Sequence, residues 1–212
     1  MKTFLKTCIL ALAAGATAVV AQPKFHVEAG ASYLALREAN FASNPSYPVA
    51  VVRNDRSAWA PYLAGGFSLT DWLGLRLSYH YVDGIESEVN RTFPGDPSAY
   101  VINHRYSEDI HLLGVAPEFK WQASSALTLF VSPELNWVVV REDARAWTNA
   151  PAVTIIPRTT RTEKDFTFGA SAGGTWALSE SWAVTLAYKY VDLNPSWDRR
   201  AHVISGGLRW SF

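Results

Sequence analysis

The sequence predicts an all-β fold, a single eight-stranded antiparallel up-and-down transmembrane β-barrel. Three observations lead to this prediction. Apolar and polar residues alternate with a period of two along most of the chain after Gln22, which is the pattern of β-strands. Short and long connections between the alternating segments follow one another strictly. Two parts of the chain also repeat each other at the scale of a hairpin, as expected for a sheet that closes by repetition.

Residues 1–21 have the pattern of a secretory signal peptide. A basic start with two lysines is followed by a short apolar run that ends in small residues. Cleavage is expected before Gln22, with cleavage after Ala18 as the alternative. We therefore expect a signal peptide at 1–21 and a barrel domain at 22–212.

The clearest strand pattern lies at 73–81. One face carries Leu73, Leu75, Leu77, Tyr79 and Tyr81, and the other carries Gly74, Arg76, Ser78 and His80. The same alternation recurs at 127–139, 182–190 and 204–212. In a strand these residues project to opposite faces, so each segment has one apolar and one polar face.

Eight strands are expected in chain order. Their approximate ranges are 25–38, 57–69, 73–86, 107–121, 127–143, 163–178, 182–193 and 200–212. Tight turns are expected at 70–72, 122–126 and 179–181, and longer loops at 39–56, 87–106, 144–162 and 194–199. This alternation predicts an up-and-down sheet with turns on one rim and loops on the other.

An internal repeat supports closure of the sheet. The segments 64–83 and 172–192 both begin with Ala-Gly-Gly and end with Tyr-x-Tyr-Val-Asp. The shorter motif Pro-Glu-x-x-Trp occurs at 117–121 and again at 133–137 on the neighbouring strand. The repeating unit is a hairpin.

Composition excludes several classes of protein. The 19 basic and 19 acidic residues give a formal net charge of zero, whereas nucleic-acid binders carry a basic excess. Charged residues are only 18% of the chain and there are nine Trp, which argues against disorder. The single Cys lies in the predicted signal, so disulfides are not expected. No later apolar run reaches the 18 residues that a transmembrane helix needs.

The distribution of aromatic residues favours a transmembrane barrel over a soluble one such as a lipocalin. Small residues and full charges share the polar face, as a narrow polar lumen requires. Aromatic residues lie at both ends of the apolar face, where Trp and Tyr favour the two interfaces of a bilayer. The girdle near the tight turns comprises Phe25, Phe67, Trp121, Trp176, Trp182, Trp210 and Phe212; the one near the loops comprises Tyr33, Tyr79, Tyr81, Trp137, Phe166, Tyr188 and Tyr190.

The signal, the eight strands, the Tyr-x-Tyr-Val-Asp ends and the closing Leu208-Arg-Trp-Ser-Phe212 resemble small bacterial outer-membrane β-barrel proteins. This group contains opacity-type surface proteins, OmpX-type proteins and the OmpA membrane domain. The resemblance covers essentially all of 22–212. It implies an outer-membrane location, contact with membrane lipid and lipopolysaccharide, and recognition of Phe212 by the barrel-assembly machinery. It is specific for the architecture and does not specify an activity.

The polar face carries seven strand-borne charges, which are Glu28, Arg76, Glu118, Lys120, Glu134, Lys189 and Arg209. An ion path or a catalytic carboxylate is one interpretation; the favoured one is a paired network that plugs the lumen, because buried charges persist when paired. Counting residues along each strand from its tight-turn end predicts that Arg76 pairs with Glu118 and that Glu28 pairs with Arg209. The second pair requires closure, since its members lie on the first and last strands. Glu134 and Lys189 are expected one layer higher.

An enzyme is not expected. Lipid A deacylases place a Ser two residues after a His, and none of the five His has this neighbour. Ser205 lies three residues after His202, on the opposite face of a strand. His80 lies beside Ser78 on the polar face without an acidic residue to orient it. No metal cluster and no cofactor are predicted.

The long loops are expected to be extracellular and to carry the function. Arg158, Arg161 and Lys164, or Arg199 and Arg200, are candidates for contact with lipopolysaccharide phosphates. Apolar runs at 48–53 and 152–156 are candidates to extend the strands above the membrane, and the protruding sheet edge would then bind an extended extracellular partner by strand addition. The favoured function is a non-enzymatic surface protein in envelope integrity or adhesion; the alternatives are a narrow pore and, less favoured, a lipid A-modifying enzyme.

Overall fold

The computed structural model describes residues 24–37, 49–54, 56–92, 101–148, 155–194 and 199–212. The predicted signal peptide and both alternative cleavage sites lie outside these residues. Within the described ranges, the chain forms no helix that is both long and apolar enough to cross a membrane.

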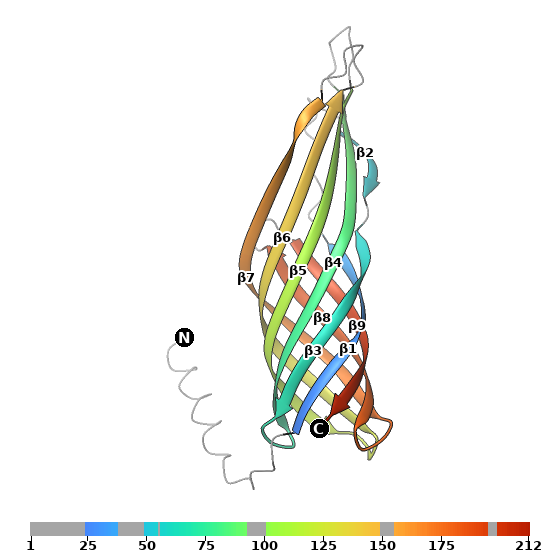
Figure 1. The fold of residues 1–212 in the computed structure, drawn as a ribbon, viewed down its shortest axis with the longest axis vertical. Helices are drawn as coiled ribbons and strands as arrows, with labels where there is room; N and C mark the ends of the chain where they lie inside the picture. Colours follow the sequence, from blue (N-terminus) through green and yellow to red (C-terminus); the bar gives the residue numbers. More distant parts are fainter. Residues whose placement is uncertain (1–23, 38–48, 55, 93–100, 149–154, 195–198) are drawn as a thin grey trace.

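Nine strands form one antiparallel sheet (Figure 1). In chain order they are β1 (Lys24–Arg37), β2 (Val49–Asn54), β3 (Ser57–Ser68), β4 (Leu73–Thr92), β5 (Val101–Gln122), β6 (Leu127–Thr148), β7 (Ile155–Ala177), β8 (Trp182–Asn194) and β9 (Arg199–Ser211). Strand β1 pairs with both β3 and β9, and β4 pairs with both β3 and β5. All strands except β2 therefore close into the predicted eight-stranded up-and-down barrel.

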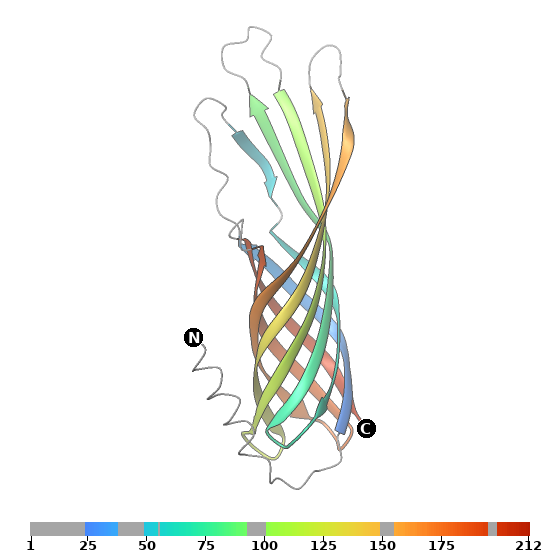
Figure 2. The same ribbon diagram turned by 90° about the vertical axis from the view of Figure 1, so that its left-hand side faces the viewer.

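Two predicted loops are largely strand in the structure. Strands β4, β5, β6 and β7 continue past the barrel as one sheet, and β2 pairs with the outer part of β4 (Figure 2). The predicted loop ranges 87–106 and 144–162 are therefore too long, because strands occupy both ends of each range. The predicted loop at 39–56 contains strand β2. The sequence analysis assigned these segments to loops because both faces of the strands carry polar residues outside the barrel, so apolar and polar residues do not alternate there. We call β2 and the outer parts of β4–β7 the outer sheet.

Hydroxyl side chains close the three tight turns. The backbone N–H of Leu73 donates to Thr70 Oγ1, that of Leu127 donates to Ser124 Oγ, and that of Trp182 donates to Ser179 Oγ, at 3.0–3.1 Å. Each hydroxyl replaces a backbone acceptor within its turn, which explains why short Ser- and Thr-containing segments form this rim. The turns lie at the predicted positions.

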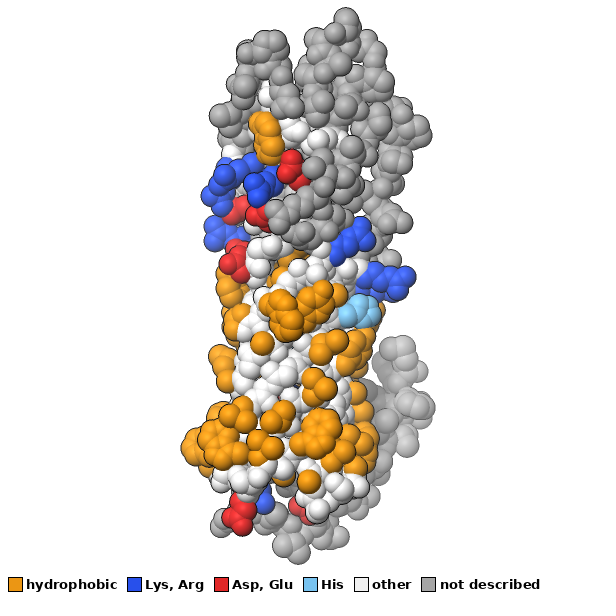
Figure 3. Space-filling model, turned by 90° about the vertical axis from the view of Figure 1, so that its right-hand side faces the viewer, with side chains coloured by type: hydrophobic (Ala, Val, Ile, Leu, Met, Phe, Trp, Pro, Cys, Tyr) orange, Lys and Arg blue, Asp and Glu red, His pale blue; other side chains and the backbone are white. Residues whose placement is uncertain are grey.

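The barrel is apolar outside and polar inside. Leu63, Leu77 and Leu186 are about half exposed on the outer surface, whereas Arg76, Glu118 and other charged side chains are buried in the lumen. Hydrophobic side chains form a band near the turn rim and a further patch near the upper end of the barrel, with charges above (Figure 3). A soluble barrel has the reverse arrangement, so this alternative is excluded.

The seam between β1 and β9 depends on Gly30. A Cβ atom at this position would overlap the backbone carbonyl of Gly206, whereas at Gly206 the nearest atom to an added Cβ is 3.9 Å away. We expect Gly30→Ala to lower the free energy of unfolding by about 1–3 kcal/mol through forced backbone shifts. The matched control Gly206→Ala should change it by less than about 0.5 kcal/mol. Urea unfolding in phospholipid vesicles, followed by Trp fluorescence, measures both; equal effects would contradict the role of the seam.

Candidate functional site

Four buried charges cross the lower lumen. Arg76 Nη2 lies 3.4 Å from Glu28 Oε2, and its Nη1 lies 3.4 Å from Glu118 Oε2. Arg209 Nη2 lies 3.2 Å from Glu28 Oε2 and 3.9 Å from Glu118 Oε2. The Tyr62 hydroxyl donates to Glu28 Oε1 at 2.9 Å. We call Glu28, Arg76, Glu118 and Arg209 the charge quartet.

The quartet contains both pairs expected from counting along the strands. Glu28 and Arg209 are register partners on β1 and β9, so their contact crosses the seam that closes the barrel. Glu134 and Lys189 lie higher in the lumen, as expected, with Oε2 and Nζ 2.6 Å apart. Lys120 is placed differently from the other six charges, because it is only half-buried near the turn rim and donates to Ser68 Oγ at 2.6 Å.

Above the quartet lies a region lined by polar side chains from β6, β7 and β8. Ser132, Asn136, Thr167 and Ser171 are all buried, and they surround the Glu134–Lys189 pair through the registers Ser132↔Ser171, Asn136↔Thr167 and Ser171↔Lys189. We call this region the polar compartment.

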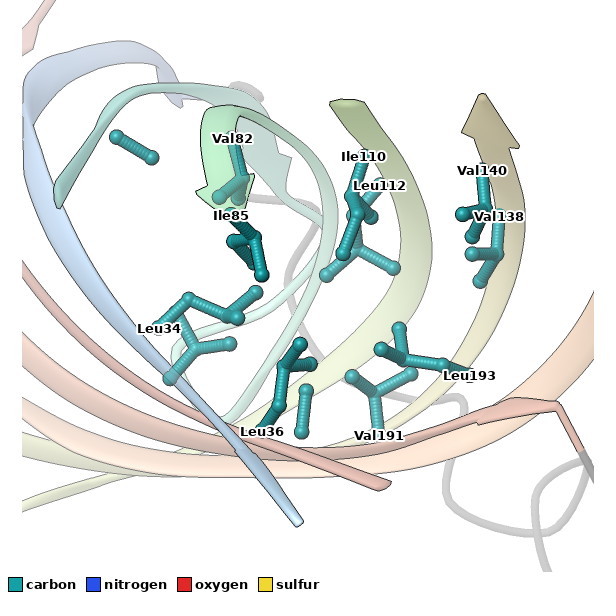
Figure 4. Packing of buried hydrophobic residues seen from close by; sticks show 13 residues of the cluster. Leu34, Leu36, Val82, Ile85, Ile110, Leu112, Val138, Val140, Val191 and Leu193 are labelled. Atoms are coloured by element: carbon teal, nitrogen blue, oxygen red, sulfur yellow. The ribbon is translucent and has the colours of Figure 1, made fainter. Parts of the chain in front are cut away.

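An apolar layer lies above the polar compartment, and the sequence analysis missed it. Thirteen buried residues form it (Figure 4). They are Leu34, Leu36, Ala60, Val82, Ile85, Ile110, Leu112, Val138, Val140, Val191, Leu193, Ala201 and Val203. Consecutive apolar residues at Leu112-Leu113 and Val138-Val139-Val140 were the available signal, since a strand with apolar residues on both faces loses its alternation.

Ion pairs lie above this layer at the mouth of the barrel, by which we mean the opening at its loop end. Arg199 of β9 contacts Glu108 of β5, a strand on the opposite side of the barrel, so the pair spans the opening. On the outer sheet, Arg161 Nη2 lies 2.7 Å from Glu163 Oε1. Glu142 is a register partner of both Glu108 and Arg161. Burial raises the pKa of the Glu142 carboxyl above its ordinary value, and the nearby Glu108 carboxylate raises it further.

Because the pKa of Glu142 is raised, the stability of the folded protein depends on pH. The folded protein binds a proton at higher pH than the unfolded chain does, so the free energy of unfolding falls as the pH rises through this range. Glu142→Gln should therefore be more stable than the parent protein at pH 7. The difference should disappear below about pH 4, where the carboxyl is protonated in both states. Urea unfolding at both pH values tests this; a difference that grows as the pH falls would contradict it.

The outer surface carries the predicted aromatic residues and three that were missed, of which Trp72 is exposed at the turn rim. Phe25, Trp121, Trp182, Trp210 and Phe212 are exposed near the turn rim, and Tyr33, Trp137, Phe166 and Tyr188 near the other end. Trp59 and Phe168 are also exposed there, at 72% and 79%, and belong to the same surface. Both lie in segments that were expected to be strands, at 57–69 and 163–178, but neither was assigned to an aromatic girdle.

The repeated Tyr-x-Tyr-Val-Asp motif builds two similar clusters on this surface. The Tyr79 hydroxyl lies 2.8 Å from His111 Nδ1, and the Tyr188 hydroxyl lies 2.6 Å from His202 Nδ1. His26 and His80 instead lie buried in the lumen, where His80 Nδ1 is 3.1 Å from Ser32 Oγ. Across the residues that the structure describes, no three His, Cys, Asp or Glu side chains are grouped to hold a metal ion.

One edge of the outer sheet belongs to β7. Strand β8 pairs with β7 only along Gly169–Ala177, while β6 continues to pair with it as far as Ile155. In the part of the chain that the structure describes, Ile155–Phe168 is therefore paired on one side only. Asp143 fastens this strand to β6, because it accepts from Thr160 Oγ1 at 2.6 Å and contacts Arg158. These hydrogen bonds hold the pKa of the Asp143 carboxyl below its ordinary value.

Comparisons with known proteins agree with this architecture. A sequence model of the outer membrane protein β-barrel domain matches residues 4–212. No curated protein matches the chain in sequence. The crystal structure of neisserial surface protein A is 13% identical, with a TM-score of 0.55, and the match covers 89% of this chain and 97% of that one. The attachment invasion locus protein Ail of Yersinia pestis is 10% identical, with a TM-score of 0.53, covering 91% and 100%. These likenesses concern the fold.

Proposed function

This chain belongs to the outer membrane protein β-barrel domain family, and we propose that it is a non-enzymatic surface protein that acts in envelope integrity or adhesion through its outer sheet. Its location is the bacterial outer membrane. The observation that carries the proposal is the β7 edge, where Ile155–Phe168 pairs with β6 alone among the described strands. Such an edge offers backbone N–H and C=O groups to an extended segment of a partner.

The position of the edge suits an extracellular partner. It lies in the sheet that rises from the loop end of the barrel, which faces outward in this class of protein (Figure 2). Arg161 and Lys164 are exposed along it. Charged side chains on an exposed edge discourage its pairing with a second copy of the same strand. A segment of different sequence is thereby favoured as the partner.

Deleting 152–156 should abolish surface binding in a strain where the intact protein confers it, because the deletion removes the start of β7 and its register with β6. Deletion of 48–53, which removes most of β2 from the opposite edge, is the matched control and should leave binding largely intact. Both variants must show the gel mobility of a folded barrel. Undiminished binding after deletion of 152–156 would reject adhesion at β7.

We propose further that the lumen is plugged by the charge quartet and the Glu134–Lys189 pair. The quartet is supported by its burial and by the mutual contacts of its members, as expected for charges that neutralise one another. A narrow pore is the alternative, and a lipid A-modifying enzyme is less favoured. Planar-bilayer recordings of the purified barrel distinguish these, since a plugged barrel shows no large, stable openings.

Membrane components are the remaining proposed partners. Arg37 and Arg200 are register partners at the upper ends of β1 and β9, so two guanidinium groups stand close to the membrane surface. Such groups suit lipopolysaccharide phosphates. Of the other candidates, Arg158, Arg161 and Arg199 each contact an acidic side chain, and Lys164 is exposed on β7. By resemblance, 1–21 is proposed as the export signal and Phe212 as the residue that the barrel-assembly machinery recognises.

A further inference from the structure

We propose that the apolar layer is a hydrophobic seal, which closes the outer end of a hydrated polar compartment and keeps water-borne solutes out of the lumen. The seal rests on the proposed function in one respect, namely that the loop end of the barrel faces outward. The experiment that tests the seal measures only access to the lumen. A result that rejected adhesion at β7 would therefore not contradict the seal.

The polar compartment is not a dry plug. Ser132 Oγ, Thr167 Oγ1, Ser171 Oγ and both polar atoms of the Asn136 side chain are buried without a hydrogen-bond partner among the described residues. They line adjacent positions of β6 and β7, so their unmet hydrogen bonds converge on one region. Buried polar atoms in folded proteins are almost always satisfied, and ordered water is the usual partner where protein groups do not supply one. Water in this compartment means that the lumen above the charge quartet is hydrated, so the exclusion of solutes from it depends on what lies above.

The apolar layer consists only of hydrophobic residues, in contrast to the polar compartment. Its members come from seven of the eight barrel strands, and none is polar or charged. Leu112 and Val138 are register partners on β5 and β6, with 0% and 1% exposure, and Ile110 and Val140 form the next such pair. Figure 4 shows the labelled side chains projecting from the surrounding strands into the interior.

The order of side chains along one strand fixes the position of the layer. The inward residues of β6 run from Glu134 and Asn136 to Val138 and Val140, and then to Glu142 at the mouth. A hydrated ion that enters past the mouth must lose its water at the layer without gaining a polar partner. Apolar constrictions close channels in this way, by excluding water.

Thiol labelling measures access to the compartment. With Cys8→Ala as the background, Ser171→Cys places a thiol inside the compartment, and Thr159→Cys places one on the exposed face of β7 above the mouth. The probe is a small, permanently charged methanethiosulfonate added to the folded full chain in micelles. We expect Ser171→Cys to react at least about 100-fold more slowly than Thr159→Cys, which reflects the cost of taking the charged probe through an apolar layer.

Perforation of the layer distinguishes a hydrophobic seal from a steric one. In the Ser171→Cys protein, the added pair Leu112→Ser and Val138→Ser should raise the labelling rate by at least about 10-fold, because hydroxyls admit water. The matched pair Leu112→Ala and Val138→Ala makes similar space but keeps an apolar lining, so the rate should stay low. Gel mobility must show that each variant is folded.

Three results would overturn the seal. They are fast labelling of Ser171→Cys behind an intact layer, no acceleration by the serine pair, and equal acceleration by the alanine pair, which would show that bulk alone blocks the probe. Slow labelling that the serine pair alone relieves supports it.

Discussion

Replacing Arg76 with Met is expected to lower the free energy of unfolding by about 3–5 kcal/mol, the range observed when one partner of a buried ion pair is removed. Arg76 contacts two carboxylates, Glu28 and Glu118, whose side chains are each only 1% exposed. Glu28 keeps Arg209 at 3.2 Å, but Glu118 keeps Arg209 only at 3.9 Å. The large loss therefore comes mainly from leaving the Glu118 carboxylate buried without a close cation.

The double variant Arg76→Met with Glu118→Gln tests this explanation. Removing the stranded carboxylate should recover most of the lost stability, because the remaining Glu28–Arg209 pair is neutral as a unit. Lys120→Met is a control near the turn rim, where a half-buried charge should cost less than about 1 kcal/mol. Urea unfolding in phospholipid vesicles gives the three values. If the double variant were as unstable as Arg76→Met alone, the loss would reflect packing around Arg76 and not charge.

Introducing a charge between the aromatic girdles should have the second large effect. Leu186 is 51% exposed on the outer face of β8, between Trp182 and Tyr188. In a bilayer this position is surrounded by hydrocarbon, so Leu186→Arg is expected to destabilise the barrel by about 2–4 kcal/mol. A barrel whose outer surface met water would tolerate the same change, as exposed substitutions usually cost less than about 0.5 kcal/mol.

Leu178 supplies a matched control for this substitution. It is 65% exposed in the turn between β7 and β8, close to the rim where the headgroups are expected. Leu178→Arg should therefore cost about 0–1 kcal/mol, since the penalty falls toward the interface. Unfolding of both variants in vesicles measures the difference. Equal costs at the two positions would contradict the placement of the bilayer between the girdles.

The sequence predicted the barrel well where each strand presents one polar and one apolar face. Strand β8 was expected at 182–193 and is observed at Trp182–Asn194. The pairs Arg76–Glu118 and Glu28–Arg209 could also be predicted, because tight turns fix the register of neighbouring strands and so set the heights of their side chains. Of the outer sheet, only the apolar runs at 48–53 and 152–156 were recognised as candidate strand extensions; the rest was expected to be loop, because its strands carry charges on both faces and resemble loops in sequence.

The sequence by itself determined the period of two, the turns and the residues that share a face. Alternation alone is identical for a barrel and its inverse, so the sequence assigned the polar face to the lumen only through the aromatic girdles, and the tertiary structure confirmed that assignment. Only the tertiary structure decided that the lumen changes from polar to apolar toward the mouth. Each contributing strand supplies only one or two residues to that layer, such as Leu34 and Val203, and these resemble lipid-facing residues until closure of the sheet brings them together. The β7 edge has the same origin, since it exists because β8 ends its pairing at Gly169.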